Sequence, residues 1–457
     1  MTDMYSHDEK RIDALLAGPG APDDARLDKI LKKAELKKGL DLEESAALLQ
    51  IRDGKQLERL FASAGRVKND IYGNRVVLFA PLYISDYCVN DCAYCGFHRR
   101  NSAVRKRLTL EEIGKQTERI IGMGHKRILL EAGEHPDTTI DYVCDAIKQI
   151  YRTKPGKGEI RRVNVNIAAT TKENYAKLKQ AGIGTYQLFQ ETYHHKTYEE
   201  LHNGPKADYE RQVTAHGRAF EAGIDDYGMG VLFGLYDHRF EVLSLLSHAK
   251  YMEARYGVGP HTISVPRFRP APSVDFNPGS LVADQDFLKL IAAIRLSLPY
   301  TGMIISTRET PEIRKKAFGI GISQASAGSC TSVGGYGDSA GIPGQFEVGD
   351  HRNVDSVVCS LMSQGCIPSF CTACYRSKRT GDAFMRLAKA GDIHYLCRPN
   401  AILTFKEFIT DYAGQETRGM GEALIAREVE KIESDERRAE TKRRLGRIEN
   451  GERDLFF

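Results

Sequence analysis

The sequence RVVLFAPLYISDYCVNDCAYC, residues 75–95, joins a short apolar run to three closely spaced cysteines. The run Val76–Ala80 has the length and β-branched content of a buried strand. Seven similar runs follow it, with segments of helical periodicity between them. The eight runs are Val76–Ala80, Arg127–Leu130, Val163–Ile167, Thr185–Phe189, Gly228–Phe233, Thr262–Val265, Met303–Ser306 and Ser323–Ser326. Eight strands alternating with helices predict a parallel (β/α)8 barrel, although the spacing alone also fits an open doubly wound sheet.

The segments outside these strands complete the expected organisation. The predicted barrel helices are Leu110–Met123, Thr139–Tyr151, Lys172–Gln180, Asp208–Ala222, Phe240–Arg255, Gln285–Leu296 and Pro311–Ala317. Asp41 and Glu44 form a capping-box pattern in a helical lead-in, and residues 334–349 hold six glycines, which indicates a linker. We therefore expect an N-terminal helical segment (1–70), the barrel (71–333), and the linker with a mostly helical, cysteine-bearing C-terminal module (334–457).

Composition limits the class of protein. Of 457 residues, 41% are hydrophobic and 28% charged, which is typical of a folded chain. No apolar run approaches the roughly 18 residues of a membrane-spanning helix, and the N-terminus shows no export signal, so we expect a cytoplasmic protein without membrane contact. The net charge of +4 argues against nucleic-acid binding. Ten cysteines in a reducing compartment indicate metal or redox chemistry.

The first cysteine cluster follows the first strand directly. Cys88, Cys92 and Cys95 place three thiols within eight residues. Three thiolates would hold a cubane iron–sulfur cluster and leave one iron without a protein ligand. A zinc site usually needs four ligands in two pairs, and no fourth partner stands at that spacing. The alternative is that the three cysteines are unrelated core residues.

This Cys-x3-Cys-x2-Cys motif, in the loop after strand one of a barrel, resembles the radical S-adenosylmethionine (SAM) superfamily. The resemblance implies a [4Fe-4S] cluster whose open iron binds SAM, and reductive cleavage of SAM to a 5′-deoxyadenosyl radical. Tyr94 matches the aromatic position that lies against the adenine. Gly133 and Glu134 resemble the Gly-Gly-Glu motif that contacts the SAM amino group, although Ala132 replaces its first glycine.

Further SAM contacts follow from the same resemblance. Glu191, after strand four, and Arg211, on the next helix, match the positions that meet the methionyl group. A charged pair suits a zwitterionic ligand. Arg211 also fits an ordinary surface position on its helix.

The second cysteine cluster points to one branch of the superfamily. Cys371, Cys374 and Cys397 form Cys-x2-Cys-x22-Cys, which resembles the C-terminal signature of the HydG family of [FeFe]-hydrogenase maturases, a family of tyrosine lyases. The segments His261–Arg267 and Glu449–Phe457 resemble this family too. The sister family, 2-iminoacetate synthase (ThiH) of thiamine synthesis, shares the barrel and tyrosine cleavage but lacks this cysteine set.

The resemblance implies the chemistry. The radical takes a hydrogen from the amino group of L-tyrosine, the Cα–Cβ bond breaks, and p-cresol and dehydroglycine form. Dehydroglycine becomes carbon monoxide and cyanide, which leave on iron as an Fe(CO)2(CN) synthon for the hydrogenase H-cluster. The implied partners are a low-potential electron donor and a HydF-type scaffold GTPase as acceptor. The alternatives are 2-iminoacetate synthase and a non-catalytic iron–sulfur carrier.

Three more residues take roles from the family. Ser306 and Arg308, after strand seven, match the pair that holds the tyrosine carboxylate, and a guanidinium fixes such a group in position and angle. The alternative for Arg308 is an ion pair with Glu309 at the barrel rim. His261 matches the ligand of an additional mononuclear iron beside the auxiliary [4Fe-4S] cluster, and the alternative is a satisfied core histidine.

The expected tyrosine site and the expected auxiliary iron site lie at opposite ends of the predicted barrel. Transfer of a product between them requires a passage through the barrel interior, which is normally packed. Asn164, Asn166, Gly228 and Gly230 are candidate small or polar residues along it, and the alternative is ordinary tight packing.

Overall fold

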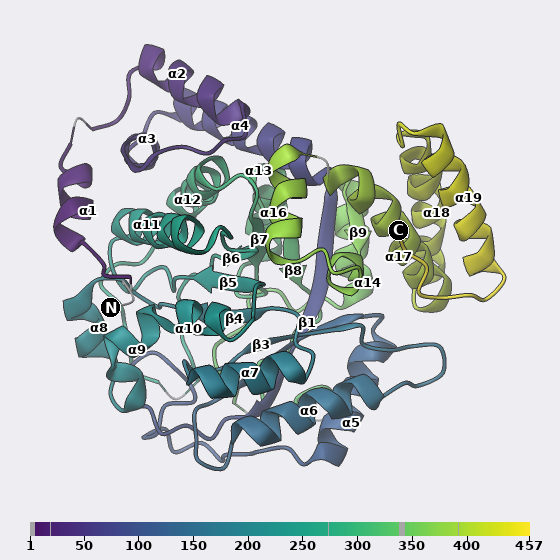
Figure 1. The fold of residues 1–457 in the computed structure, drawn as a ribbon, viewed down its shortest axis with the longest axis horizontal. Coiled ribbons are helices and arrows are strands. Elements are labelled where there is room, and N and C mark those ends of the chain that lie inside the picture. The colour runs from purple at the N-terminus through teal and green to yellow at the C-terminus, as the bar shows by residue number, and fades with distance from the viewer. Residues whose placement is uncertain (1–4, 19, 273, 338–342, 392) are drawn as a thin grey trace.

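The eight predicted strands form a closed parallel barrel in the computed structural model (Figure 1). The structure describes residues 5–18, 20–272, 274–337, 343–391 and 393–457. The strands run in the order β2-β3-β4-β5-β6-β7-β8-β1, and β1 pairs with β2 to close the ring. They are β1 (Arg75–Ser85), β2 (Arg127–Ala132), β3 (Arg162–Asn166), β4 (Tyr186–Phe189), β5 (Tyr227–Gly230), β6 (Thr262–Ser264), β7 (Gly302–Ile305) and β8 (Gln324–Ser326). The barrel prediction is confirmed, and the open sheet is wrong.

Helices surround the barrel on its outer face (Figure 1). Those between strands are α5 (Leu110–Gly122), α6 (Ile140–Arg152), α7 (Lys172–Gln180), α8 (His195–Leu201), the 3₁₀ turn η1 (Pro205–Ala207), α9 (Tyr209–Val213), α10 (Ala215–Glu221), α11 (His238–Tyr256), α12 (Asp284–Ser297) and α13 (Pro311–Ile320). The predicted helix Asp208–Ala222 is divided at Thr214 into α9 and α10. No helix in the described ranges is long and apolar enough to cross a membrane.

Helical segments flank the barrel at both ends of the sequence. The first group is α1 (Glu9–Leu16), α2 (Asp24–Glu35), α3 (Leu42–Leu49) and α4 (Gly54–Tyr72). The second is α14 (Val354–Ser363), α15 (Ala373–Arg376), α16 (Gly381–Ala390), α17 (Ile393–Asp411), α18 (Gln415–Glu430) and α19 (Asp435–Glu449). The capping box of Asp41 and Glu44 starts α3 as predicted. Part of the glycine-rich linker, residues 338–342, lies outside the described residues.

Strand β1 is longer than the predicted run and has a neighbour that the sequence did not indicate. A ninth strand, β9 (Ile367–Ser369), pairs in parallel with Arg75–Val77 at the start of β1. Cys371 follows β9 by two residues. The C-terminal module is therefore joined to the barrel by backbone hydrogen bonds as well as by side-chain packing.

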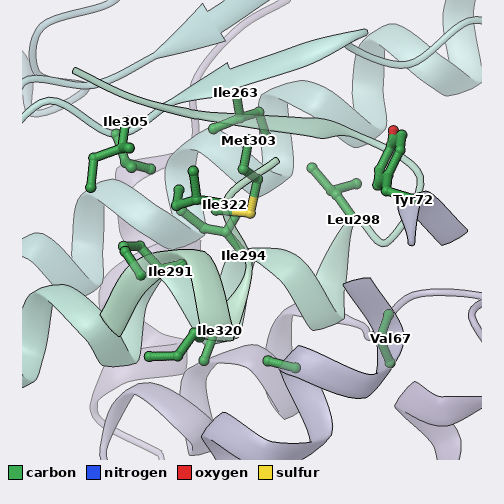
Figure 2. Close-up of a cluster of buried hydrophobic side chains, with 14 of the residues drawn as sticks. Val67, Tyr72, Ile263, Ile291, Ile294, Leu298, Met303, Ile305, Ile320 and Ile322 are labelled. Atoms are coloured by element: carbon green, nitrogen blue, oxygen red, sulfur yellow. The ribbon is translucent and has the colours of Figure 1, made fainter. Parts of the chain in front are cut away.

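Residues on the outer face of the barrel pack against the surrounding helices. Figure 2 shows Ile263 of β6 with Met303 and Ile305 of β7 pointing toward Ile291 and Ile294 of α12. All five are buried. Because side chains alternate along a strand, the residues between them face the barrel interior, where the functional cavities lie.

A buried ion pair supports the loop after β7. Arg314 of α13 and Asp350 are both fully buried and form an ion pair, and Arg314 Nη2 also donates to the Ser326 carbonyl at 2.6 Å. The backbone nitrogens of Gly349 and Asp350 donate to the Thr307 carbonyl at 2.7 and 3.1 Å. The Arg314–Asp350 pair thus fixes the segment around Asp350, which bonds to Thr307 between the candidate residues Ser306 and Arg308.

We predict that Arg314→Met destabilises the protein by about 3 kcal/mol, because it leaves the Asp350 carboxylate buried with one less partner. Urea unfolding of the two proteins at neutral pH measures the difference. Arg314→Met combined with Asp350→Leu should recover most of this stability. The half-buried Arg352, which also pairs with Asp350 at 2.7 Å, is the matched control, and Arg352→Met should cost less. An equal cost for both single variants would contradict the account.

Candidate active site and cluster sites

A cavity of about 190 Å³ opens at the C-terminal end of the strands. Cys88, Cys92 and Cys95 line it, at the end of the loop that leaves β1. The other predicted residues of this end that line it are Tyr94, Gly133, Glu134, Glu191, Ser306 and Arg308. The predicted site residues after β1, β2, β4 and β7 are therefore brought together in one upper cavity, as a (β/α)8 barrel requires.

The cysteine loop is packed against the end of β2. The Val89 backbone nitrogen donates to the Glu134 carbonyl at 2.8 Å, and Asn90 Nδ2 donates to Glu134 Oε2 at 2.8 Å. A Cβ atom at Gly133 would lie 2.3 Å from the Tyr87 carbonyl oxygen. Glycine is therefore required where the two loops cross, and Ala132 leaves that crossing intact.

Two ion pairs place charge around the upper cavity. Arg211 Nη2 lies 2.5 Å from Glu134 Oε1, and Lys206 Nζ lies 2.7 Å from Glu191 Oε1. Arg211 therefore pairs with a residue that lines the cavity, although Arg211 does not line the cavity itself. Glu191 has a φ of +69°, a left-handed conformation that non-glycine residues rarely adopt. Sequence reasoning missed Lys206, whose only signal was a lone basic residue after a Gly-Pro pair.

Tyr94 is held by a histidine. Its hydroxyl lies 2.9 Å from His202 Nε2, and the two rings meet edge to face at a centroid distance of 5.6 Å. The hydrogen bond fixes the direction of the Tyr94 ring, which borders the cavity beside the cysteines.

Arg308 lines the cavity near the Glu131 and Glu191 carboxylates, but it forms no salt bridge with either of them. Its guanidinium lies over the Phe346 ring, 3.3 Å from the centroid, and makes no hydrogen bond or ion pair with any described residue. Glu309 pairs instead with Arg267, with Nε to Oε1 at 3.0 Å. The expected alternative, an Arg308–Glu309 pair, is therefore wrong. A half-buried guanidinium that no hydrogen bond or salt bridge occupies is suited to an anionic ligand.

Glu131 is a second cavity residue that the sequence did not single out. It stands near the end of β2 and faces Tyr83 of β1, Arg308 and Tyr336. Burial raises the pKa of its carboxyl from 4.5 to about 7, although the Tyr83 hydroxyl and Arg308 oppose the shift. Its strand position, two residues before Gly133, would have been the only available signal.

The second cysteine cluster lies at the opposite end of the barrel. A separate lower cavity is lined by Cys371, Cys374, Cys397 and His261. Its other lining residues include three arginines at the starts of strands, namely Arg75, Arg127 and Arg162. The chain thus brings together, at the N-terminal end of the strands, four predicted ligands that are separated by up to 136 positions.

The His261 ring packs against Phe384, but its buried Nδ1 atom makes no hydrogen bond. Its Nδ1 lies 3.5 Å from Asp226 Oδ2, without a hydrogen bond, and its ring lies 4.0 Å from that of Phe384. Asp226 is held by Arg162 and Thr185, each at 2.8 Å. Burial lowers the pKa of His261 to about 4, so its imidazole is neutral at physiological pH. His261 is therefore not a core histidine with both ring nitrogens hydrogen-bonded.

Arg75 and Arg127 lie near the thiol groups of the lower cavity and partly offset the rise in thiol pKa that burial causes. Burial raises the pKa of Cys397 to about 12, and the nearby Arg75 opposes that shift. Arg127 donates to the Cys371 carbonyl at 2.9 Å. The Nε atoms of Arg75 and Arg127 are buried without a partner. Within the described ranges no three His, Cys, Asp or Glu side chains are grouped closely enough to hold a single metal ion.

An apolar layer separates the two cavities. Phe79, Leu129 and Ile304 form a buried cluster that is the floor of the upper cavity. The residues two positions earlier on the same strands, Val77, Arg127 and Gly302, line the lower cavity, and the two cavities share no lining residue among the described residues. The upper and lower cavities are therefore separate, and no continuous passage joins them in the described part of the chain.

The candidate passage residues serve packing instead. A Cβ atom at Gly228 would lie 2.5 Å from Thr262 Oγ1, and one at Gly230 would lie 2.6 Å from Phe189 Cδ1. Asn164 Oδ1 accepts from Arg162 Nε at 2.8 Å. Of the four candidates, Asn166 alone lines the upper cavity. The tight-packing alternative is right for both glycines.

Comparison with known proteins identifies the family. The family model of the radical SAM superfamily matches residues 82–246. The model of the Biotin and Thiamin Synthesis associated domain matches residues 264–367. A 2-iminoacetate synthase of Escherichia coli K12 is 32% identical over 332 residues, which are 72% of this chain and 86% of the relative. A crystal structure of HydG, a maturase of the [FeFe]-hydrogenase, is 54% identical with a TM-score of 0.96, over 98% of this chain and 99% of that one. The chain belongs to the HydG family of radical SAM enzymes.

A second HydG structure, from Carboxydothermus hydrogenoformans, is 38% identical with a TM-score of 0.83, and it matches 96% of this chain and all of that one. The radical SAM family implies a [4Fe-4S] cluster and SAM. The residues of the upper cavity fit both: three thiols border open space, and acidic and basic side chains surround it. The lower cavity fits a second thiolate-held cluster, because its orphaned arginine nitrogens suit sulfur or an anion.

We predict that Gly133→Ala weakens SAM binding by about tenfold or more, because its methyl group must displace the Tyr87 carbonyl and with it the cysteine loop. Equilibrium binding of SAM to the anaerobically reconstituted protein measures the effect. Gly122→Ala is the matched control, since a Cβ there meets nothing within 4 Å. Unchanged SAM affinity in Gly133→Ala would show that this crossing does not position the site.

Glu131→Gln should change the pH dependence of stability. Because the folded-state pKa is raised from 4.5 to about 7, the wild-type protein is not penalised below pH 4.5, where the carboxyl is protonated in both states. The penalty grows between pH 4.5 and 7 and is constant above. Glu131→Gln should therefore be more stable than wild type by up to about 3 kcal/mol above pH 7. Urea unfolding of the metal-free proteins between pH 5 and 8.5 tests this, with Glu111→Gln as an exposed control. A stability difference that does not vary with pH would contradict it.

Proposed function

We propose that this chain is a tyrosine lyase of [FeFe]-hydrogenase maturation. It cleaves the Cα–Cβ bond of L-tyrosine to p-cresol and dehydroglycine, and it converts dehydroglycine to carbon monoxide and cyanide. These leave on iron as an Fe(CO)2(CN) synthon. The observation that carries the proposal is the lower cavity, where Cys371, Cys374, Cys397 and His261 meet at the far end of a radical SAM barrel.

The upper cavity is the proposed site of tyrosine cleavage. Cys88, Cys92 and Cys95 would hold the barrel cluster, which with SAM supplies the 5′-deoxyadenosyl radical that takes a hydrogen atom from the substrate amine. Tyr94 would lie against the adenine. Gly133, Glu134, Glu191 and Arg211 would surround the methionyl group, where the Glu134–Arg211 ion pair offers both charges to a zwitterion.

Arg308 and Ser306 would position the substrate. The Arg308 guanidinium forms no salt bridge with a described residue, and it lies over the Phe346 ring. A tyrosine carboxylate would satisfy this cation, and the Ser306 hydroxyl stands two residues away on the same loop. Fixing the carboxylate also fixes the direction of the amine, and such positioning contributes much of the rate of a reaction between bound groups.

The lower cavity is the proposed site where the second half-reaction ends. Cys371, Cys374 and Cys397 would hold an auxiliary [4Fe-4S] cluster, and the neutral His261 imidazole would bind an additional iron that leaves as part of the product. Asp226 would orient His261 through Nδ1. The proposed partners are L-tyrosine, a low-potential electron donor and a HydF-type scaffold GTPase that accepts the iron product.

An anaerobic assay tests the proposal. The reconstituted protein is mixed with SAM, dithionite and tyrosine, and p-cresol, cyanide and haem-trapped carbon monoxide are measured. We expect all three products. Cresol without carbon monoxide and cyanide would favour a 2-iminoacetate synthase, which the 32% identity to such an enzyme keeps as the second candidate. Neither cresol nor the diatomic products, with clusters intact, would indicate an iron–sulfur carrier.

We predict that replacing Cys371, Cys374 and Cys397 by serine abolishes carbon monoxide while p-cresol formation continues, because no described residue lines both the upper and the lower cavity. The matched control is replacement of Cys359, which lies outside both cavities and contacts Thr417, and it should leave both products unchanged. Equal loss of cresol and carbon monoxide in the triple variant would contradict two separate sites.

A further inference from the structure

The segment Arg453–Phe457 has no part in the function proposed so far. It belongs to the stretch whose sequence resembles the HydG family, yet none of its residues lines either cavity. Its contacts nevertheless converge on the elements that carry the second cysteine set. They involve the loop around Cys374, helix α17 with Cys397, and the start of β3.

Asp454 contacts all three elements. Its carboxylate forms an ion pair with Arg376 of α15 and lies 3.1 Å from Arg161 Nε, just before β3. Its backbone nitrogen donates to Glu407 Oε1 of α17 at 2.6 Å. Arg161 and Glu407 are themselves paired at 2.9 Å, with side chains 3% and 1% exposed. Because these groups are buried or half-buried, the contacts are stronger than those of a surface ion pair.

The backbone at Asp454 adopts a left-handed conformation. Its φ is +63°, which aspartate and asparagine tolerate better than most residues other than glycine. Contacts of Asp454 with its neighbours stabilise this turn. The two guanidinium groups and the Glu407 carboxylate are those contacts, so the turn at Asp454 is built around them.

Phe456 and Phe457 add further contacts between this segment and the elements that carry the second cysteine set. Phe457 N donates to Asn400 Oδ1 at 2.8 Å, and Arg379 Nη2 donates to the Phe457 main-chain oxygen at 2.5 Å. The Arg376 guanidinium stacks over the Phe456 ring, 4.7 Å from its centroid. Segment 453–457 therefore lies between the cysteine loop and α17 and bonds to both.

These contacts are close to the cluster ligands along the chain. Arg376 is two residues after Cys374, whose carbonyl also accepts from Arg379 N at 2.7 Å. Asn400 lies about one helical turn after Cys397 on α17. Arg161 directly precedes Arg162, which lines the lower cavity. The segment thus contacts residues next to Cys374 and the helix that carries Cys397.

We propose that segment 453–457 is a positioning element for the auxiliary cluster, and that Asp454 is its principal residue. By joining α15, α17 and the base of the barrel, it holds Cys371 and Cys374 at the distance from Cys397 that one cluster can span. This inference rests on the proposed second cluster, and it adds residues that touch no ligand but fix the spacing of those that do.

The test measures how firmly the second cluster is held. In a parent variant with Cys88, Cys92 and Cys95 replaced by serine, all bound iron reports the lower cavity. Asp454→Ala in this parent should release iron to excess chelator about tenfold faster and change the electron paramagnetic resonance spectrum of the reduced cluster. Asp454→Asn keeps an acceptor oxygen and tolerates positive φ, so its rate should fall between the two. Asp435→Ala, which removes an exposed carboxylate that pairs with Arg438 on α19, should match the parent.

A reciprocal background separates positioning from general destabilisation. With Cys371, Cys374 and Cys397 replaced by serine, Asp454→Ala should leave iron retention by the barrel cluster unchanged. Equal acceleration in both backgrounds, or no acceleration in either, would overturn the inference. A first parent that binds no iron would overturn the proposed second cluster and this inference together, whereas a parent that holds iron as firmly with Asp454→Ala as without it overturns the inference alone.

Discussion

The pairing of strand β1 along its whole length is the constraint on which both sites depend. Its C-terminal half pairs with β2, and its N-terminal half pairs with β8 and β9. The first set of contacts closes the barrel and directs the chain into the Cys88 loop. The second attaches β9, from which the chain proceeds to Cys371. One strand of eleven residues therefore fixes the two cysteine sets at opposite ends of the same barrel.

The charge and polarity of the side chains inside the barrel differ from one layer to the next. The upper layer offers a cation at Arg308 that forms no salt bridge, and a carboxyl at Glu131 whose pKa burial raises to about 7. The floor of Phe79, Leu129 and Ile304 is apolar. The lower layer is basic, with Arg75, Arg127 and Arg162 at the strand starts. Each end thus suits a different ligand, and a product that crosses the barrel must displace side chains that pack between the two cavities.

Much of this arrangement could be predicted from the sequence. Strand positions followed from apolar runs, because burial on both faces leaves that signal in each strand. The cysteine sets and Gly133 followed from short motifs. Lys206, Glu131 and β9 could not be predicted, since single charged residues and a three-residue strand carry no periodicity. The closed passage was also not predictable, because whether an interior layer is filled depends on which side chains from different strands meet at the same height.

The central claim is that two iron-bearing sites occupy the two ends of one barrel. Anomalous diffraction at the iron edge, from crystals of the anaerobically reconstituted protein, tests it directly. We expect two separate iron peaks, one bordered by Cys88, Cys92 and Cys95 and the other by Cys371, Cys374, Cys397 and His261. A single iron peak in the upper cavity, or a second peak away from these ligands, would contradict it.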